Sequence, residues 1–214
     1  MIIVITGPSG CGKSTLIRRA LKRTEGLSFS VSHTTRPPRG SEVNGREYHF
    51  VSLTRFHGMV KAGRFVEWAV VHGHHYGTSL KELRDKGRSG DVILDIDIQG
   101  AFQVRRKFPE ADFIFIMPPR FAELKKRLEG RHEDGAEAIA SRLEQARQEM
   151  KAYAGFDFLI INDDREAALQ RFVSVIRGQR CRRERMEAAV RPILKSFGLG
   201  GRPAAKIKKR PARG

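Results

Sequence analysis

A glycine-rich octapeptide near the N-terminus has the spacing of a phosphate-binding loop. It reads Gly7-Pro8-Ser9-Gly10-Cys11-Gly12-Lys13-Ser14 and fits the pattern G-x-x-x-x-G-K-[ST]. An apolar run over residues 2–5 predicts a buried strand before it, and residues 13–23 have helical spacing after it. Backbone N–H groups of such a loop surround the β- and γ-phosphates of a nucleotide, and the helix adds the positive end of its dipole. The loop therefore predicts binding of ATP or GTP.

Two side chains of this loop are expected to contact the nucleotide and its metal ion, and a third is expected only to fill space. Lys13 is expected to bridge the β- and γ-phosphates, and the Ser14 hydroxyl to bind Mg²⁺. We interpret Cys11 as a small filler at a variable loop position. Because Cys181 is the only other cysteine, we expect no disulfide framework, and a reducing compartment is compatible.

An apolar strand over residues 92–98 carries two aspartates. Asp95 and Asp97 stand two residues apart, hence on one face, at the carboxyl end of the strand, where doubly wound folds hold their ligands. An aspartate there in a P-loop protein commonly serves Mg²⁺, directly or through water, and we assign Asp97 this role beside Ser14. Alternatively, one aspartate caps the helix that begins near Gln99.

A basic loop offers groups for a second phosphate. The prolines within residues 36–39 favour polyproline II, whose three residues per turn return Arg36 and Arg39 to the same side. Two guanidinium groups that face one way can clamp a phosphate, although a basic loop is more often only solvated. The hydroxyl groups of Ser32 and Tyr48 could add donors.

Glu67 precedes the only tryptophan inside an apolar strand over residues 65–71. An unpaired carboxylate is costly in such a place. A guanine base would satisfy it, because its N1–H and 2-amino group offer two adjacent donors, whereas adenine offers no such pair. The alternative is a solvent-facing strand position, which the two-residue period allows and which Glu67 alone slightly favours.

Three arginines on two predicted helices could act on a transferring phosphoryl group. Arg127 and Arg131 are four residues apart, and Arg142 follows on the next helix, so closure of this segment could bring them together. A solvated surface is the alternative. We interpret the histidines within residues 72–76 as an ordinary loop, because no cysteine or acidic partner stands at the spacing of metal ligands.

The composition fits one cytoplasmic domain. The chain has 214 residues, of which 40% are apolar, and no apolar stretch approaches the length of a membrane span. Residues 177–214 hold thirteen Lys and Arg against two Glu, which is +11 of the net charge of +17. The remaining charge of about +6 suits a phosphate-binding enzyme.

Hydrophobic periodicity predicts a parallel α/β core with an insert. Core strands are expected at residues 2–5, 92–98, 113–117 and 158–161. The insert is expected to hold short strands at 46–51 and 65–71 and helices at 54–62 and 80–86. One long helix is expected from Glu166 to Arg191, and Pro192 would end or bend it.

Taken together, these motifs resemble the guanylate kinase family over residues 2–177. The resemblance rests on GPSGCGKST, VSHTTRPPRGSEVNGREYHFV, FVEWAVVHGHHYGTS, LDIDIQG, PPRFAELKKRLEGR followed by SRLEQA, and INDD. It implies a P-loop NTPase core with a parallel β-sheet flanked by helices, a small mixed α/β insert that binds GMP, and a helical lid. The expected segments are the core (1–31, 87–125 and 150–197), the GMP-binding region (32–86), the lid (126–149) and a basic, disordered tail (198–214).

The resemblance also implies an activity and a set of site residues. The expected reaction is Mg²⁺-assisted, in-line transfer of the γ-phosphoryl group of ATP to GMP, and to dGMP as well. Expected catalytic residues are Lys13, Arg36, Arg131 and Arg142. ATP is expected at Gly7, Pro8, Ser9, Gly10, Cys11, Gly12, Lys13, Ser14, Thr15 and Asn162. GMP is expected at Ser32, Arg36, Arg39, Tyr48, Glu67, Tyr76, Thr78 and Asp95.

Three alternatives remain at this point. A binding module of the same family without catalysis would not need Lys13, Ser14 and the lid arginines. A kinase for a phosphorylated sugar is disfavoured by the Thr34-Thr35-Arg36 loop and Glu67. The basic tail could bind nucleic acid or another polyanion, but a solvated end explains it at least as well, and we do not favour such a partner. The sequence leaves the oligomeric state open.

Overall fold

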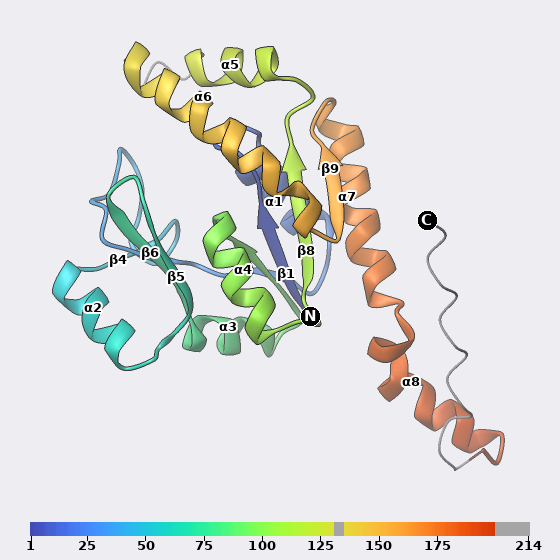
Figure 1. Ribbon diagram of the computed structural model, residues 1–214. Coiled ribbons are helices and arrows are strands. Elements are labelled where there is room, and N and C mark those ends of the chain that lie inside the picture. Colours follow the sequence, from blue (N-terminus) through green and yellow to red (C-terminus); the bar gives the residue numbers. More distant parts are fainter. Residues whose placement is uncertain (131–134, 200–214) are drawn as a thin grey trace. The chain divides into compact units, whose positions relative to one another are not determined.

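A five-stranded parallel sheet forms the centre of the protein. The computed structural model describes residues 1–130 and 135–199. The strand order is β2 (Leu27–Phe29), β7 (Asp91–Asp95), β1 (Ile2–Thr6), β8 (Asp112–Met117) and β9 (Phe158–Ile161), and all neighbours run parallel (Figure 1). This order crosses over on both sides of β1, as in doubly wound folds. The prediction of a P-loop NTPase type of α/β core is confirmed.

Helices cover both faces of this sheet, which explains the unbroken apolar runs of its strands. Helices α1 (Lys13–Arg23) and α7 (Arg165–Arg180) pack on one face, and α4 (Ile98–Lys107) packs on the other. Within β1, Ile3 and Ile5 belong to the first cluster, whereas Val4 belongs to the second. All three side chains are at most 1% exposed.

A second, mixed sheet occupies the segment that we predicted as the insert. Its order is β4 (His49–Phe50), β3 (His33–Thr34), β6 (His74–Ser79) and β5 (Phe65–Val71), and it is accompanied by α2 (Leu53–Lys61) and α3 (Leu80–Gly87). The strand predicted over residues 46–51 is confined to β4, because residues 43–47 form a hydrogen-bonded turn with Gly45 at φ +83°.

Helices α5 (Phe121–Glu129) and α6 (Ala136–Met150), with the short 3-10 helix η1 (Lys151–Gly155), include the described part of the predicted lid (126–149) and extend beyond both its ends. They share a small apolar cluster of their own. Its buried members are Leu124, Leu128, Leu143 and Ala146. Among the described residues, no helix is long and apolar enough to cross a membrane.

The single helix predicted from Glu166 to Arg191 is wrong. Helix α7 ends at Arg180, where Cys181 N–H donates to Gly178 O, and α8 (Arg183–Ser196) begins after this turn and continues through Pro192. Among the described residues, residues 177–199 belong to a second compact unit, and the first unit spans Met1–Ile176. The physical reason is that Ile176 is the last core residue of α7 and α8 buries no side chain.

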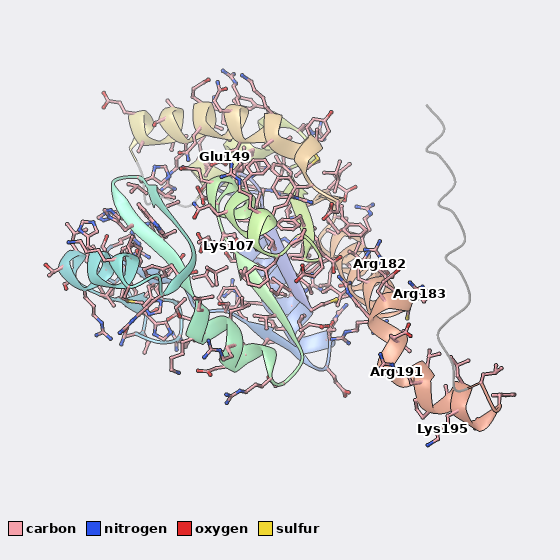
Figure 2. All side chains as sticks on the ribbon, turned by 60° about the horizontal axis from the view of Figure 1, so that its bottom comes forward. Lys107, Glu149, Arg182, Arg183, Arg191 and Lys195 are labelled. Carbon is pink, nitrogen blue, oxygen red and sulfur yellow. The ribbon has the colours of Figure 1, made fainter. Side chains whose placement is uncertain are left out.

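The second unit is rich in basic side chains. Figure 2 shows Arg182, Arg183, Arg191 and Lys195 projecting from it, and all four are exposed. The predicted tail, residues 198–214, lies outside the described residues from position 200 onward.

Candidate active site

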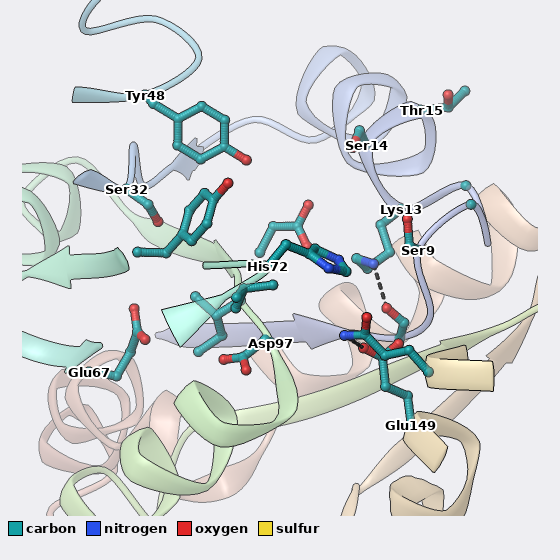
Figure 3. A pocket seen from close by; sticks show the side chains of 18 residues that line it. Ser9, Lys13, Ser14, Thr15, Ser32, Tyr48, Glu67, His72, Asp97 and Glu149 are labelled. Atoms are coloured by element: carbon teal, nitrogen blue, oxygen red, sulfur yellow. Dashed lines mark hydrogen bonds between the residues drawn. The ribbon is translucent and has the colours of Figure 1, made fainter. Parts of the chain in front are cut away.

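A pocket of about 330 Å³ brings most of the predicted residues together (Figure 3). Its walls come from the loop after β1, the carboxyl end of β7, the second sheet and α6. The predicted residues that line it are Gly7, Ser9, Gly10, Gly12, Lys13, Ser14, Thr15, Ser32, Tyr48, Glu67, Tyr76, Asp95 and Asp97. Those outside its lining are Pro8, Cys11, Arg36, Arg39, Thr78, Arg142 and Asn162. Arg131 lies outside the described residues.

The phosphate-binding loop requires glycine for its backbone shape. Gly10 and Gly12 have φ of +84° and +97°, a region that side chains rarely adopt. Gly12 directly precedes α1, so the loop leads into the positive end of that helix. The Lys13 ammonium folds back and donates to Gly7 O at 2.5 Å and to Pro8 O at 3.3 Å.

Asn162 and Arg127 hold this loop from behind. Asn162 Nδ2 donates to Cys11 O at 2.6 Å, and Arg127 donates to Cys11 O at 3.4 Å and to Asn162 O at 3.1 Å. The structure thus uses the Asn162 amide to brace the loop, while its predicted place near ATP stays a prediction. Cys11 is fully buried in the main core, as expected for a small side chain that fills space, and burial raises the pKa of its thiol.

The two arginines of the basic loop do not share a face. Arg36 is 6% exposed and donates to Glu42 Oε1 at 2.9 Å and to Tyr76 OH at 3.2 Å, whereas Arg39 is exposed. Just before the two prolines, Thr34 Oγ1 accepts the Arg36 N–H at 3.1 Å and closes a turn. Their predicted contacts with a phosphate remain predictions.

Glu42 was missed by the sequence analysis. Its two carboxylate oxygens accept from the Arg36 guanidinium and, at 2.8 Å, from the Arg39 N–H. These bonds, the Arg36 bond first, hold the pKa of Glu42 below its usual value. A carboxylate three residues after the second arginine is the signal that could have revealed it, because such spacing closes a turn.

Glu67 is buried, which rules out the solvent-facing alternative. It is 3% exposed, and its Oε1 accepts the Thr78 N–H at 2.7 Å. At a β-bulge between Phe65 and Glu67, three consecutive residues, Phe65, Val66 and Glu67, are buried, so the two-residue alternation fails there. Lys107 at the end of α4 donates to Val66 O at 2.5 Å and holds the bulge (Figure 2).

The environment of Glu67 perturbs its titration. Burial raises the pKa of the carboxyl group to about 7, against hydrogen bonds from Thr78 that favour the ionised form. Room for the carboxylate depends on Gly100 in α4, because a Cβ there would lie 2.5 Å from Glu67 Oε2. A buried carboxyl group with a perturbed pKa at a pocket wall is typical of a functional site.

Asp95 and Asp97 both line the pocket, but they belong to different elements. Strand β7 ends at Asp95, and Asp97 is the N-cap of α4, where its Oδ1 accepts the Gly100 N–H at 2.9 Å. The capping alternative therefore holds for Asp97. Burial raises the pKa of both carboxyl groups, and Lys13 opposes the rise at Asp95.

Helix α6 contributes two lining residues that the sequence analysis missed, Gln145 and Glu149. Arg142 is half-buried on the same helix. Spacings of three and four residues place Arg142, Gln145 and Glu149 along one helical face, and this periodicity is the signal that could have found them. His72 also lines the pocket, and His75 instead pairs with His57 of α2, with 3.4 Å between their Nε2 atoms.

The fold and the phosphate-binding loop at the pocket together define a P-loop kinase. The guanylate kinase family model matches residues 1–179. The chain belongs to the guanylate kinase family.

Relatives and a solved structure agree with this assignment. A guanylate kinase of Syntrophotalea carbinolica is 45% identical over 189 residues, which are 88% of this chain and 90% of that protein. One from Nostoc sp. is 50% identical over 170 residues, or 79% of this chain and 85% of that protein. The crystal structure of guanylate kinase from Anaplasma phagocytophilum matches with a TM-score of 0.76 and 30% identity, covering 93% of this chain and 95% of that one.

Proposed function

We propose that the protein transfers the γ-phosphoryl group of ATP to GMP, giving ADP and GDP. The observation that carries this proposal is the buried Glu67 carboxylate on the wall of the pocket that also contains the phosphate-binding loop. A guanine base offers two adjacent donors to such a carboxylate. Relatives named guanylate kinase, which match most of the chain, support the same reaction.

On the nucleotide side, the loop is expected to act by positioning and charge. Its N–H groups would receive the β- and γ-phosphates, and Lys13 would exchange its carbonyl partners for phosphate oxygens. Arg142, together with Arg131, would stabilise the charge of the transferring group. In-line transfer needs no protein nucleophile, because positioning and charge compensation supply most of the acceleration.

On the acceptor side, polar groups in and around the second sheet would hold GMP, one set at its guanine base and another at its phosphate. Glu67 and Thr78 would bind the guanine, with Asp95 beside them. The hydroxyl groups of Ser32, Tyr48 and Tyr76 line the pocket or its edge, and Arg36 donates to Tyr76 OH at 3.2 Å. With Arg39, this group would bind the GMP phosphate.

The oxygen-bearing side chains near the phosphate-binding loop fit Mg²⁺ as ligands. Ser14, Asp95 and Asp97 line the pocket with oxygen atoms only, the ligand type that this hard cation prefers. Among the described residues no group of three or more His, Cys, Asp or Glu could hold a metal ion by itself. This agrees with an ion held chiefly by substrate phosphates and water. Mg²⁺ would neutralise phosphate charge, and Ser14 and Asp97 would hold it, directly or through water.

The test is ADP release by the full chain with ATP and Mg²⁺ and with GMP, dGMP, AMP, UMP or CMP in parallel. Turnover with GMP that is lost in Lys13→Ala supports the proposal. ATP binding without turnover of any monophosphate would instead favour a binding module or a kinase for a phosphorylated sugar.

A further inference from the structure

Glu149 lies in the last turn of α6 and reaches the phosphate-binding loop. It is half-buried and lines the same pocket as Ser9 and Lys13, toward which Figure 3 shows it pointing. Its carboxylate accepts from Gln145 Nε2 at 3.0 Å, and the backbone N–H of Ser9 favours its ionised form. The Lys13 ammonium is the main opposite charge that acts on it. A carboxylate of α6 thus shares the pocket with the donor groups of the loop.

These loop groups are the ones that a nucleotide needs. The N–H groups of a phosphate-binding loop and its lysine are the donors offered to the β- and γ-phosphates. In the structure, the Lys13 ammonium donates to Gly7 O and Pro8 O and also attracts the Glu149 carboxylate, whose ionised form the Ser9 N–H favours as well. Burial, the largest cause, raises the pKa of Glu149, and the Asp97 carboxylate across the pocket acts in the same direction, whereas the Lys13 ammonium opposes the rise.

We propose that Glu149 competes with the phosphates of ATP and ADP for Lys13 and the Ser9 N–H. Because two anions cannot share these donors, α6 must release the loop before a nucleotide binds, and Glu149 replaces the phosphates when ADP leaves. Glu149 therefore sets nucleotide affinity and ADP release, without touching the transferring atoms. The inference rests on the proposed nucleotide site at this loop.

The size of the effect follows from the energy of such a contact. If only a fraction of the free protein has an open loop, the apparent Kd equals the intrinsic Kd divided by that fraction. A hydrogen bond to a charged group stabilises by an amount that corresponds to about tenfold or more in an equilibrium constant. Since Glu149 is only half-buried, we take the lower end of this range, about a tenfold change in the equilibrium constant. Glu149→Gln should therefore tighten ADP binding about tenfold, or about 1.4 kcal/mol.

The experiment is calorimetric titration of the full chain with ADP and with a non-hydrolysable ATP analogue. Glu144→Gln is the matched control, because it removes the same charge from an exposed position of α6, where Glu144 contacts Arg147 and Gln148. Tighter nucleotide binding only in Glu149→Gln, with slower ADP release and an unchanged Kd for GMP, supports the proposal. A thermal melt shows that each variant is folded, and Glu149→Asp, which shortens the side chain, replaces Glu149→Gln if that variant is not.

Two other results would overturn the proposal. Unchanged or weaker nucleotide binding in Glu149→Gln would mean that the carboxylate positions Lys13 instead of competing for it. Equal tightening in Glu144→Gln would assign the effect to net charge. Failure of the proposed function is recognised separately, because the unsubstituted chain would then bind no ADP or would form none in the presence of GMP.

Discussion

Substitution of Glu67 by glutamine tests the guanine site by removing a charge at constant shape. The amide oxygen of the new side chain can keep the Thr78 N–H that Glu67 Oε1 accepts at 2.7 Å. The amide nitrogen then replaces the other acceptor. The edge of guanine that would face residue 67 offers only donors, N1–H and the 2-amino group. The substitution therefore removes one hydrogen bond to guanine and brings the new amide N–H against a guanine N–H.

The expected loss in activity follows from these two changes. A hydrogen bond to a charged group contributes about 1.5–3 kcal/mol, and an unsatisfied buried donor costs a similar amount. We expect kcat/KM for GMP to fall about 100- to 1000-fold, which corresponds to about 3–4 kcal/mol. The KM for ATP should change little, because Glu67 lies on the second sheet, away from the phosphate-binding loop.

The same substitution should stabilise the ligand-free protein at high pH. Burial raises the pKa of Glu67 from 4.5 to about 7, so the stability that this carboxyl group contributes is fully present below pH 4.5 and is lost as the pH rises through 7. The difference between the two pKa values corresponds to about 3 kcal/mol. Since glutamine does not ionise, Tm of Glu67→Gln should exceed that of the unsubstituted chain by about 5–10 °C at pH 8 and by little at pH 4.5.

The assay pairs steady-state rates for GMP with thermal unfolding at both pH values. Lower activity combined with a higher Tm at pH 8 is an outcome that simple structural damage does not produce. The reasoning would be refuted by unchanged GMP turnover, or by a Tm at pH 8 that falls on substitution.

Three further substitutions test the surroundings of the pocket. Gly100→Ala should raise KM for GMP at least tenfold and leave KM for ATP unchanged in parallel rate assays, because the new Cβ would lie 2.5 Å from Glu67 Oε2. Arg36→Lys should raise KM for GMP about tenfold, since an ammonium cannot reproduce the planar bonds to Glu42 and Tyr76; an unchanged KM would remove Arg36 from the phosphate site. Asn162→Ala should lower the free energy of unfolding by about 1–3 kcal/mol and weaken ATP more than GMP in titrations, because the phosphate-binding loop loses its brace.

Some features of this protein are determined by short stretches of its sequence. The phosphate-binding loop is recognisable because its donors are consecutive backbone N–H groups and its glycines meet a local backbone requirement, as at Gly12. The strands of the parallel sheet are recognisable because helices cover both faces, so that neighbouring interior positions such as Ile3 and Val4 are both apolar. The resemblance to the guanylate kinase family assigned the remaining segments, the GMP-binding region and the lid.

Other features were decided only by the tertiary structure. The burial of Glu67 depends on a bulge opposite β6, and the separation of Arg36 from Arg39 depends on a turn closed by Thr34 and on the carboxylate of Glu42. Glu149 meets the phosphate-binding loop from an element more than a hundred residues away. Periodicity reports which face of an element is apolar, but it does not encode bulges, turns or the partners that distant elements supply. For that reason the sequence by itself determined the nucleotide loop and the class of fold, while the tertiary structure decided how each charged side chain of the pocket is held.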